Sequence, residues 1–353
     1  MKKVLNTPVL YVVMALLGFT FTSCNDNNDA LELPIDNSII KESVIITSNY
    51  ELEAFLGLGV TEIHGSLSIS GFPAEEIKGF EQLTYIKYDL KITANDNLKS
   101  MKGFENLTTV GGDLSFSDND LLTSIGDFEN LTSVGGDLTI KKNNSLTSLK
   151  GLQGLESITG SLFVLHNSSL ENLEGLDNLS SVNRSLYIGD ISYKPGNTQL
   201  KSLEGLENLT SVGNNFIIAN NENLMSIESL KNLTSVKHLY ILDNLNINSI
   251  EGLENLSSVD GILNISGNDN LTSFKGVENI VSIGEKLLIG NNDKLTSLSD
   301  FESLTTVGEE VIITYNDVLQ DYCFLKDVNI GNEIDISNNA YNPTLSQIQS
   351  DCP

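Results

Sequence analysis

The same apolar pattern recurs with a period of about 24 residues along most of this chain of 353 residues. Leu or Ile occupies one position of the repeat in ten successive units, namely Leu98, Leu122, Leu146, Leu170, Leu200, Leu224, Ile247, Leu271, Leu295 and Leu319. All steps between these residues are equal except that from Leu170 to Leu200, which is longer, and that from Leu224 to Ile247, which is slightly shorter. A fixed period in this range predicts a solenoid, in which each unit buries its apolar side chains only against its neighbours.

Each unit is predicted to consist of short strands joined by tight turns. Apolar and polar residues alternate in runs such as Leu114-Ser115-Phe116, as expected for strands with one face inward. Residues that tolerate positive backbone dihedral angles, such as Gly111-Gly112 and Asn143-Asn144, lie between these runs. The sequence therefore predicts an all-β solenoid of about 11 coils.

Asparagine recurs just after the predicted strand in most units. The positions are Asn95, Asn119, Asn143, Asn167, Asn268, Asn292, Asn316 and Asn339. A run such as Asn268-Asp269-Asn270 could suit calcium, but none of these runs has the loop of an EF-hand with its terminal Glu. The favoured interpretation is a ladder of amides that satisfies turn backbone from coil to coil, and we predict no metal site.

Residues 1–24 are predicted to be an export signal. Lys2 and Lys3 precede an apolar run from Val9 to Phe21, and Cys24 follows shortly after. This arrangement resembles a bacterial lipoprotein signal, which implies that Cys24 becomes the lipidated first residue. The alternative is a plain secretory signal cut near Cys24.

Residues 25–43 are predicted to be a flexible acidic tether. The run from Asn25 to Asp29 is polar and acidic. It resembles the surface-export tag of lipoproteins from some Gram-negative gut bacteria. The resemblance implies a protein anchored in the outer membrane and exposed on the cell surface, which touches the membrane only through its lipid anchor.

Residues 44–353 are predicted to form a single domain with a cap at each end. Residues 44–64 form the first cap, in which Ser48 and Glu51 make a capping box for a short helix that ends near Gly57. Residues 65–319 hold the repeats, and residues 320–353 form the second cap. Cys323 and Cys352 are expected to form a disulfide in an exported protein, worth up to ~3 kcal/mol.

The repeat unit is well represented by the residues from Gly103 to Phe116 with the Asn that follows them. This unit resembles the receptor L domain of the insulin and epidermal growth factor receptors, and related bacterial leucine-rich surface lipoproteins. The resemblance covers residues 44–353. It implies a right-handed β-helical solenoid that binds other macromolecules and carries out no catalysis.

The sequence offers no convincing catalytic site or cofactor site. His64, His166 and His238 lie far apart in the chain, with no zinc motif or nucleophile-base pair around them. Acidic residues recur at one repeat position and are interpreted as a solvated stripe, namely Glu105, Glu129, Glu207, Glu254, Glu278 and Glu302. Asp190 is the one carboxylate that we would test for a role in glycoside chemistry.

The charge of the chain excludes some partners. Its 47 acidic and 20 basic residues give a net charge of −27, so nucleic acid and anionic membrane surfaces would be repelled. A basic protein or a neutral glycan remains compatible with this charge. Sequons such as Asn106-Leu107-Thr108 and Asn130-Leu131-Thr132 are interpreted as by-products of the repeat.

Variation on the outward face of the strands marks a candidate binding surface. The outward residue of successive units is predicted to be Ser68, Lys91, Ser115, Thr139, Phe163, Tyr187, Ile217, Tyr240, Asn264, Leu288 and Ile312. The next outward position adds Leu165, Ala219 and Leu242 in the middle units. Such an apolar stripe, ~15 Å long, is uncommon on a monomer that makes no use of it.

An insertion from Ile191 to Gln199 lies beside the stripe, and insertions on one face of a solenoid often shape its binding surface. We hypothesise a recognition patch with His166 and His238 at its edge, made of Phe163, Leu165, Tyr187, Tyr193, Ile217, Tyr240 and Leu242. The patch predicts binding of an extracellular protein or a glycan. Three alternatives are that the insertion covers the stripe, that the stripe is a homodimer contact, or that it is simply tolerated surface. An envelope spacer without a ligand is the second candidate function.

Overall fold

The computed structural model describes residues 38–192 and 195–352. The expected signal segment with Cys24, residues 25–37 of the expected tether, and Tyr193 of the hypothesised patch lie outside the described residues. The predictions made for them therefore stay predictions.

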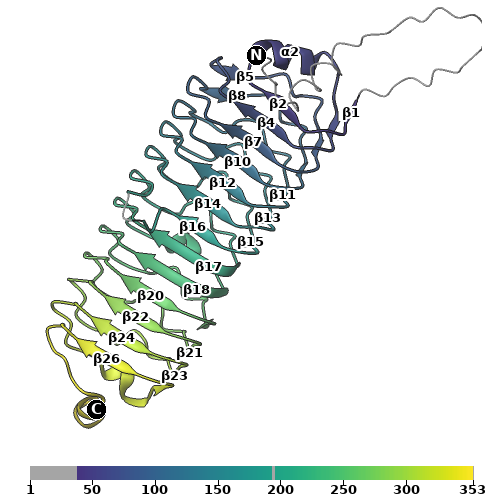
Figure 1. Cartoon of the computed structure of the whole chain (residues 1–353). Helices are drawn as coiled ribbons and strands as arrows, with labels where there is room; N and C mark the ends of the chain where they lie inside the picture. Colours follow the sequence, from purple (N-terminus) through teal and green to yellow (C-terminus); the bar gives the residue numbers. More distant parts are fainter. Residues whose placement is uncertain (1–37, 193–194, 353) are drawn as a thin grey trace, which may run out of the picture.

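The described chain forms one elongated stack of about 12 coils with a spacing of about 24 residues, which confirms the predicted all-β solenoid (Figure 1). The longer parallel strands form one row along the stack, namely β2 (Val44–Ile46), β4 (Leu67–Ser70), β7 (Leu90–Thr93), β10 (Leu114–Ser117), β12 (Leu138–Lys141), β14 (Leu162–Leu165), β16 (Leu186–Ile188), β17 (Ser211–Ala219), β18 (Ser235–Leu242), β20 (Leu263–Ser266), β22 (Leu287–Gly290), β24 (Val311–Thr314) and β26 (Ile334–Ser337).

Two-residue strands form a second row, namely β1 (Ile39–Ile40), β3 (Glu62–Ile63), β6 (Tyr85–Ile86), β9 (Thr109–Val110), β11 (Ser133–Val134), β13 (Ser157–Ile158), β15 (Ser181–Val182), β19 (Ser258–Val259), β21 (Ser282–Ile283), β23 (Thr306–Val307) and β25 (Asn329–Ile330). The long strand β17 pairs with both β15 and β16, so it takes part in both rows. A third pairing joins β5 (Glu76–Ile77) to β8 (Ser100–Met101).

Each strand pairs with the equivalent residues one repeat further along the chain. Leu114 lies opposite Leu138 and Phe116 lies opposite Ile140, and all four side chains are fully buried. Because identical positions stack, the interior becomes a set of columns of like side chains. One column contains Phe80, Phe104 and Phe128, whose successive ring centroids are 4.7 and 4.8 Å apart.

The two irregular repeat steps leave the strand register intact. The long step from Leu170 to Leu200 places its extra residues outside the strands, so that Tyr187 still lies opposite Ile217. The short step is absorbed at the corner of the coil, where the register shifts between Val212 and Asn215 opposite β18. The outward row of side chains is therefore continuous through both irregularities.

A ladder of buried Asn side chains runs along the stack beside the long strands. Asn119 shows the pattern: its Nδ2 donates to the Ile92 carbonyl at 2.8 Å, and its Oδ1 accepts the Asn95 backbone N–H at 3.1 Å. This confirms the predicted amide ladder. It also contains three members that the sequence analysis missed, namely Asn197, Asn221 and Asn244.

The ladder fixes a strained backbone position. Every non-glycine residue with positive φ in the described part of the chain directly precedes a ladder Asn, for example Ala94 (φ 54°) and Lys142 (φ 53°). This conformation costs roughly 1 kcal/mol per residue outside glycine. The buried amide bonds offset that cost, and the preceding residues form a row along one edge of the long strands.

Both ends of the stack are closed. Helix α2 (Asn49–Leu56) begins at Ser48, whose hydroxyl accepts the Glu51 N–H as predicted, and it buries Leu52 and Phe55. At the other end, helix η2 (Cys323–Asp327) and helix α3 (Leu345–Asp351) are joined by the predicted disulfide between Cys323 and Cys352, with a Cα–Cα distance of 5.4 Å. Strands β25 and β26 continue both strand rows, so the stack extends past residue 319, where the repeats were expected to end.

Replacing a ladder amide should destabilise the fold. In Asn143→Ala, the Asn119 backbone N–H and the Phe116 carbonyl lose buried partners, and we expect a loss of about 2–4 kcal/mol in unfolding free energy. Asn144→Ala is the control, because Asn144 is exposed. Urea denaturation of both variants measures the difference, and equal losses would contradict the structural role of the ladder.

Removing the disulfide should loosen the C-terminal coils first. The bond closes a loop with a sequence separation of 29 residues, so Cys323→Ser with Cys352→Ser should cost about 3 kcal/mol locally. Stability in a solenoid is largely a sum over neighbouring coils, so the N-terminal coils should be unaffected. Hydrogen exchange resolved along the chain tests this, and equal acceleration in all coils would contradict it.

Candidate functional site

The in-register stacking brings the middle outward residues into one line. Phe163 lies opposite Tyr187, Tyr187 opposite Ile217, and Ile217 opposite Tyr240. The next outward position holds Leu165, Ala219 and Leu242, with Gly189 between the first two. We call Phe163, Leu165, Tyr187, Ile217, Ala219, Tyr240 and Leu242 the sheet patch.

The members of the sheet patch differ in their accessibility. Phe163, Leu165, Tyr187, Tyr240 and Leu242 are partly exposed. Ile217 is only 6% exposed although its side chain points outward, because it lies between two tyrosines. Ala219 is fully buried. The accessible surface is therefore two apolar areas on either side of a filled centre.

The aromatic rings of the sheet patch cover one another. The Phe163 and Tyr187 rings stack with centroids 5.0 Å apart and planes inclined by 19°. The Tyr240 ring stacks on His238, with centroids 6.3 Å apart. Burial raises the pKa of Tyr240, and the nearby charge of Glu285 raises it further. One face of each ring is thus occupied by a neighbouring side chain.

The ends of the insertion pack on the sheet patch. Gly189, at φ 86°, leaves no room for a Cβ, which would collide with the Ala219 carbonyl oxygen. The Gly196 N–H donates to the Asn220 carbonyl at 2.8 Å, and Asn197 then takes its place in the amide ladder. Gly196, near the end of the insertion, thus lies against the Ala219 carbonyl, and Ala219 is fully buried while the aromatic row stays partly exposed.

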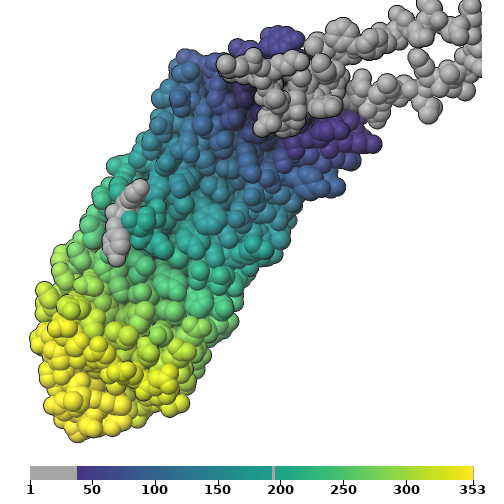
Figure 2. Space-filling view, in the orientation of Figure 1, coloured from purple at the N-terminus to yellow at the C-terminus, as the bar shows by residue number. Residues whose placement is uncertain are grey.

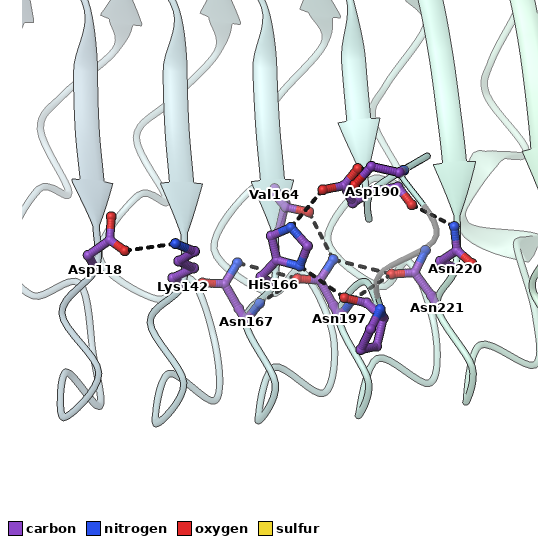
Figure 3. A network of polar contacts seen from close by, with 11 residues as sticks. Asp118, Lys142, Val164, His166, Asn167, Asp190, Asn197, Asn220 and Asn221 are labelled. Carbon is purple, nitrogen blue, oxygen red and sulfur yellow. Dashed lines mark hydrogen bonds and ion pairs between the residues drawn. The ribbon is translucent and has the colours of Figure 1, made fainter.

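A polar clamp holds this insertion (Figure 3). His166 Nε2 lies 2.7 Å from Asp190 Oδ2, and His166 Nδ1 lies 2.9 Å from the Pro195 carbonyl oxygen. Asp190 Oδ1 accepts the Ser192 N–H at 2.8 Å, and Asn220 Nδ2 donates to the Asp190 carbonyl at 2.6 Å. Both partners of His166 are oxygen atoms that can accept a hydrogen bond.

The carboxylate of the clamp is stabilised in its ionised form. Burial acts to raise the pKa of Asp190, but the hydrogen bonds from Ser192 and the contact with His166 outweigh it and lower that pKa. Both oxygens of the carboxylate therefore have a partner within the protein. The clamp positions the chain and leaves no free general acid or base at Asp190.

Asp190 lies in line with the row of residues that precede the ladder Asn. In Figure 3 this row contains Asp118, Lys142, His166, Asp190 and Asn220 on successive strands. Lys142 pairs with Asp118 at 3.3 Å on one side of the clamp. On the other side, burial and Asp269 raise the pKa of Asp243, and burial and Asp293 raise the pKa of Asp269 despite the opposing effect of Lys294. The charge beyond the clamp is therefore predominantly negative.

At the opposite edge of the sheet patch, the His238 side chain is hydrogen-bonded to the backbone. Its Nδ1 accepts the Ile262 N–H at 3.0 Å, so the proton of the neutral ring lies on Nε2. His64 contacts Glu62 in the first coils at 2.8 Å. The three histidines thus serve separate local contacts.

The acidic stripe predicted to be merely solvated has a structural role in several coils, which corrects the sequence interpretation. Glu207, Glu254 and Glu278 each accept the backbone N–H of the glycine two residues earlier, at 2.8 to 3.0 Å. These bonds stabilise the turn that begins each glycine-containing corner. Glu recurs at this repeat position because its carboxylate accepts the glycine N–H, a contact that the sequence pattern alone did not reveal.

The sequons also make repeat contacts. Asn106 Nδ2 donates to the Glu81 carbonyl at 2.7 Å, and Asn130 Nδ2 donates to the Glu105 carbonyl at 2.6 Å. The Thr108 hydroxyl donates to the Thr84 carbonyl at 3.1 Å. These contacts between coils support the interpretation of the sequons as by-products of the repeat.

The described part of the chain has neither a cluster of metal ligands nor a membrane-spanning helix. Residues 38–192 and 195–352 contain no group of three or more His, Cys, Asp or Glu side chains placed to hold a metal ion. In the same residues, no helix combines the length and apolar character needed to cross a bilayer.

The fold defines the class of this protein as a β-solenoid of stacked coils, consistent with a repeat solenoid of the leucine-rich type. Colours that follow the sequence succeed one another along the length of the molecule, as this class requires (Figure 2). Neither protein-family models nor curated proteins give a match to the chain.

Breaking the clamp should release the insertion without unfolding the stack. We expect Asp190→Asn to accelerate hydrogen exchange at the Ser192 and Gly196 amides, because it replaces the carboxylate that contacts His166 and Ser192 with a neutral amide. Asp118→Asn, which breaks the exposed ion pair in the same row, is the control. Unchanged exchange in Asp190→Asn would contradict the clamp.

The clamp should also respond to acid. The folded-state pKa of Asp190 lies below that of a free carboxyl, ~3.9, so its stabilising contribution is fully present above that pH. The contribution is lost as the pH falls through the lowered pKa. Exchange at Ser192 measured across this range tests the direction, and protection that increases on acidification would contradict it.

Proposed function

We propose that this protein is a non-enzymatic, lipid-anchored protein of the outer membrane, exposed on the cell surface, that binds a protein or a glycan through the sheet patch. The anchoring part rests on Cys24 and the acidic run after it, and on their resemblance to lipoprotein signals. We also propose that the solenoid is related to receptor L domains. The regular leucine-rich repeat and the stacked coils support this relationship.

The observation that carries the binding proposal is an abrupt change along one row of the sheet. The outward residues of β4, β7, β10 and β12 are polar, namely Ser68, Lys91, Ser115 and Thr139. The next four are Phe163, Tyr187, Ile217 and Tyr240. Core packing cannot explain this change, because the inward residues are apolar in all of these strands. A cluster of partly exposed aromatics therefore favours a contact surface.

An envelope spacer without a ligand is the second candidate. The full burial of Ala219, whose carbonyl lies against Gly196 of the insertion, favours it, because a local cover is one reason for apolar residues to gather there. The cover is incomplete, since Phe163, Tyr187 and Tyr240 stay partly exposed. The incomplete cover is why we rank the binding function first.

The proposal predicts that binding depends on the tyrosines. The soluble domain, residues 36–353, would be screened against arrays of glycans and extracellular proteins beside Tyr187→Ser with Tyr240→Ser. We expect the affinity of at least one interaction to fall more than about tenfold, because aromatic side chains at the centre of an interface often contribute this much to binding.

The matched control is Leu288→Ser with Ile312→Ser, which removes two apolar side chains from the same outward row further along the stack. Circular dichroism confirms that each variant is folded. Interactions that survive in the tyrosine variant, or that fail equally in the control, would contradict the binding surface. If neither the soluble domain nor its variants bind anything on the arrays, the spacer function is favoured.

A further inference from the structure

The structure narrows the class of partner that the sheet patch suits, and this step rests on the proposed binding function. A sugar ring bound to an aromatic platform packs against an open ring face. In the sheet patch, Phe163 and Tyr187 cover one face of each other, and Tyr240 has one face on His238. The side of Tyr187 that faces the next strand is filled by Ile217. The patch thus presents mainly ring edges and aliphatic groups, which suit apolar side chains of a protein.

The polar groups beside the patch are also poorly suited to a glycan. Sugar hydroxyls need free donors and acceptors around the aromatic contact. The Asp190 carboxylate is already bonded to His166 and Ser192, and the Asn220 amide donates to the Asp190 carbonyl. The adjacent outward position supplies Leu165, Ala219 and Leu242, which offer no polar side-chain atoms. A sugar hydroxyl that lost water here without gaining a partner would carry the full cost of its desolvation.

The charge around the patch favours a basic partner. Asp243 directly follows Leu242, and the raised pKa values of Asp243 and Asp269 reflect burial and repulsion between neighbouring acids. Glu285 acts on Tyr240 from the opposite edge. Cations occur at this surface too: Lys142 pairs with Asp118, Lys294 donates to Asn270, and Arg184 and Lys237 are exposed at the coil corners. The acidic groups outweigh these cations over the whole chain, which has a net charge of −27. This charge attracts cationic partners and repels a second copy of the chain.

We propose that the sheet patch binds a basic, extended polypeptide segment, with apolar side chains on Tyr187, Tyr240 and Leu242 and with Lys or Arg beside Asp243 and Asp269. Four strands span ~15 Å, which about five extended residues would cover. The partner is thus a protein with alternating apolar and basic residues. Its affinity falls with ionic strength, because part of the attraction is between exposed charges.

The test uses synthetic peptides of about 12 residues, long enough to cover the patch. One set alternates Leu, Phe or Trp with Lys, and matched sets replace Lys by Glu or by Ser. Fluorescence anisotropy with the soluble domain should show binding of the Lys set, which weakens severalfold between about 50 and 200 mM salt. The Glu set should not bind, and Tyr187→Ser with Tyr240→Ser should abolish binding of the Lys set.

A pair of charge variants isolates the local acids from the net charge. Asp243→Asn with Asp269→Asn should weaken binding of the Lys set about three- to tenfold and flatten its salt dependence. Asp120→Asn with Asp317→Asn removes the same charge from other coils at the position that follows a ladder Asn, and should have a smaller effect. Equal effects of the two variants would overturn the local acidic contact and leave only non-specific attraction.

The outcomes separate this inference from the proposed function. Binding of the Glu set as tightly as the Lys set, or failure of all peptides while a glycan binds in a manner that depends on Tyr187 and Tyr240, would overturn the basic polypeptide and leave a binding surface. Concentration-dependent dimerisation that is lost in the tyrosine variant would identify a second copy of the chain as the occupant instead. If no probe of any class depends on those tyrosines, the proposed function itself fails.

Discussion

The structure depends on parallel strands stacked in register, with the buried Asn ladder as the contact that makes the stacking possible. Each ladder amide pairs a strand carbonyl and a turn N–H that would otherwise be buried without partners, as Asn119 does for Ile92 and Asn95. Except at Gly196 before Asn197, the residue before each ladder Asn has positive φ. Because the ladder demands an equivalent Asn in each coil, irregular lengths are confined to corners and loops. That constraint keeps the outward row aligned.

The alignment separates the residues that stabilise the stack from the residues that form its surface. From β4 through β24 the inward positions of the long strands repeat and are buried, whereas the outward residues vary from coil to coil. Apolar residues at four successive outward positions fall into one row because the stack has no offset between strands, with the nearly buried Ile217 between the partly exposed aromatic rings. The insertion departs after Gly189 and returns at Asn197, so it modifies that surface without disturbing the core. A binding surface on this fold therefore requires only local changes.

The sequence was sufficient for the parts of the structure that repetition controls. The strand period, the alternation at Leu114 to Phe116, the helix N-cap at Ser48 and the Cys323–Cys352 disulfide are all confirmed, although the Glu51 carboxylate accepts the Thr47 N–H rather than the Ser48 N–H that a capping box requires. The ladder members Asn197, Asn221 and Asn244 were missed, although each lies three residues before a repeated Leu or Ile and that spacing could have revealed them. The close approach of Gly196 to the Ala219 carbonyl could not be predicted, because it depends on the path of the insertion. The engagement of His166 by Asp190 and Pro195 depends on the same path.

The central claim is that the sheet patch contacts another protein, and site-specific photo-crosslinking on intact cells tests it most directly. A benzophenone-bearing phenylalanine analogue would replace Tyr187, with the same replacement at Leu288 as the control on the same outward row. The account predicts an adduct with a basic polypeptide, identified by mass spectrometry, from position 187 and not from position 288. The absence of any adduct at position 187, or equal adducts at both positions, would contradict it.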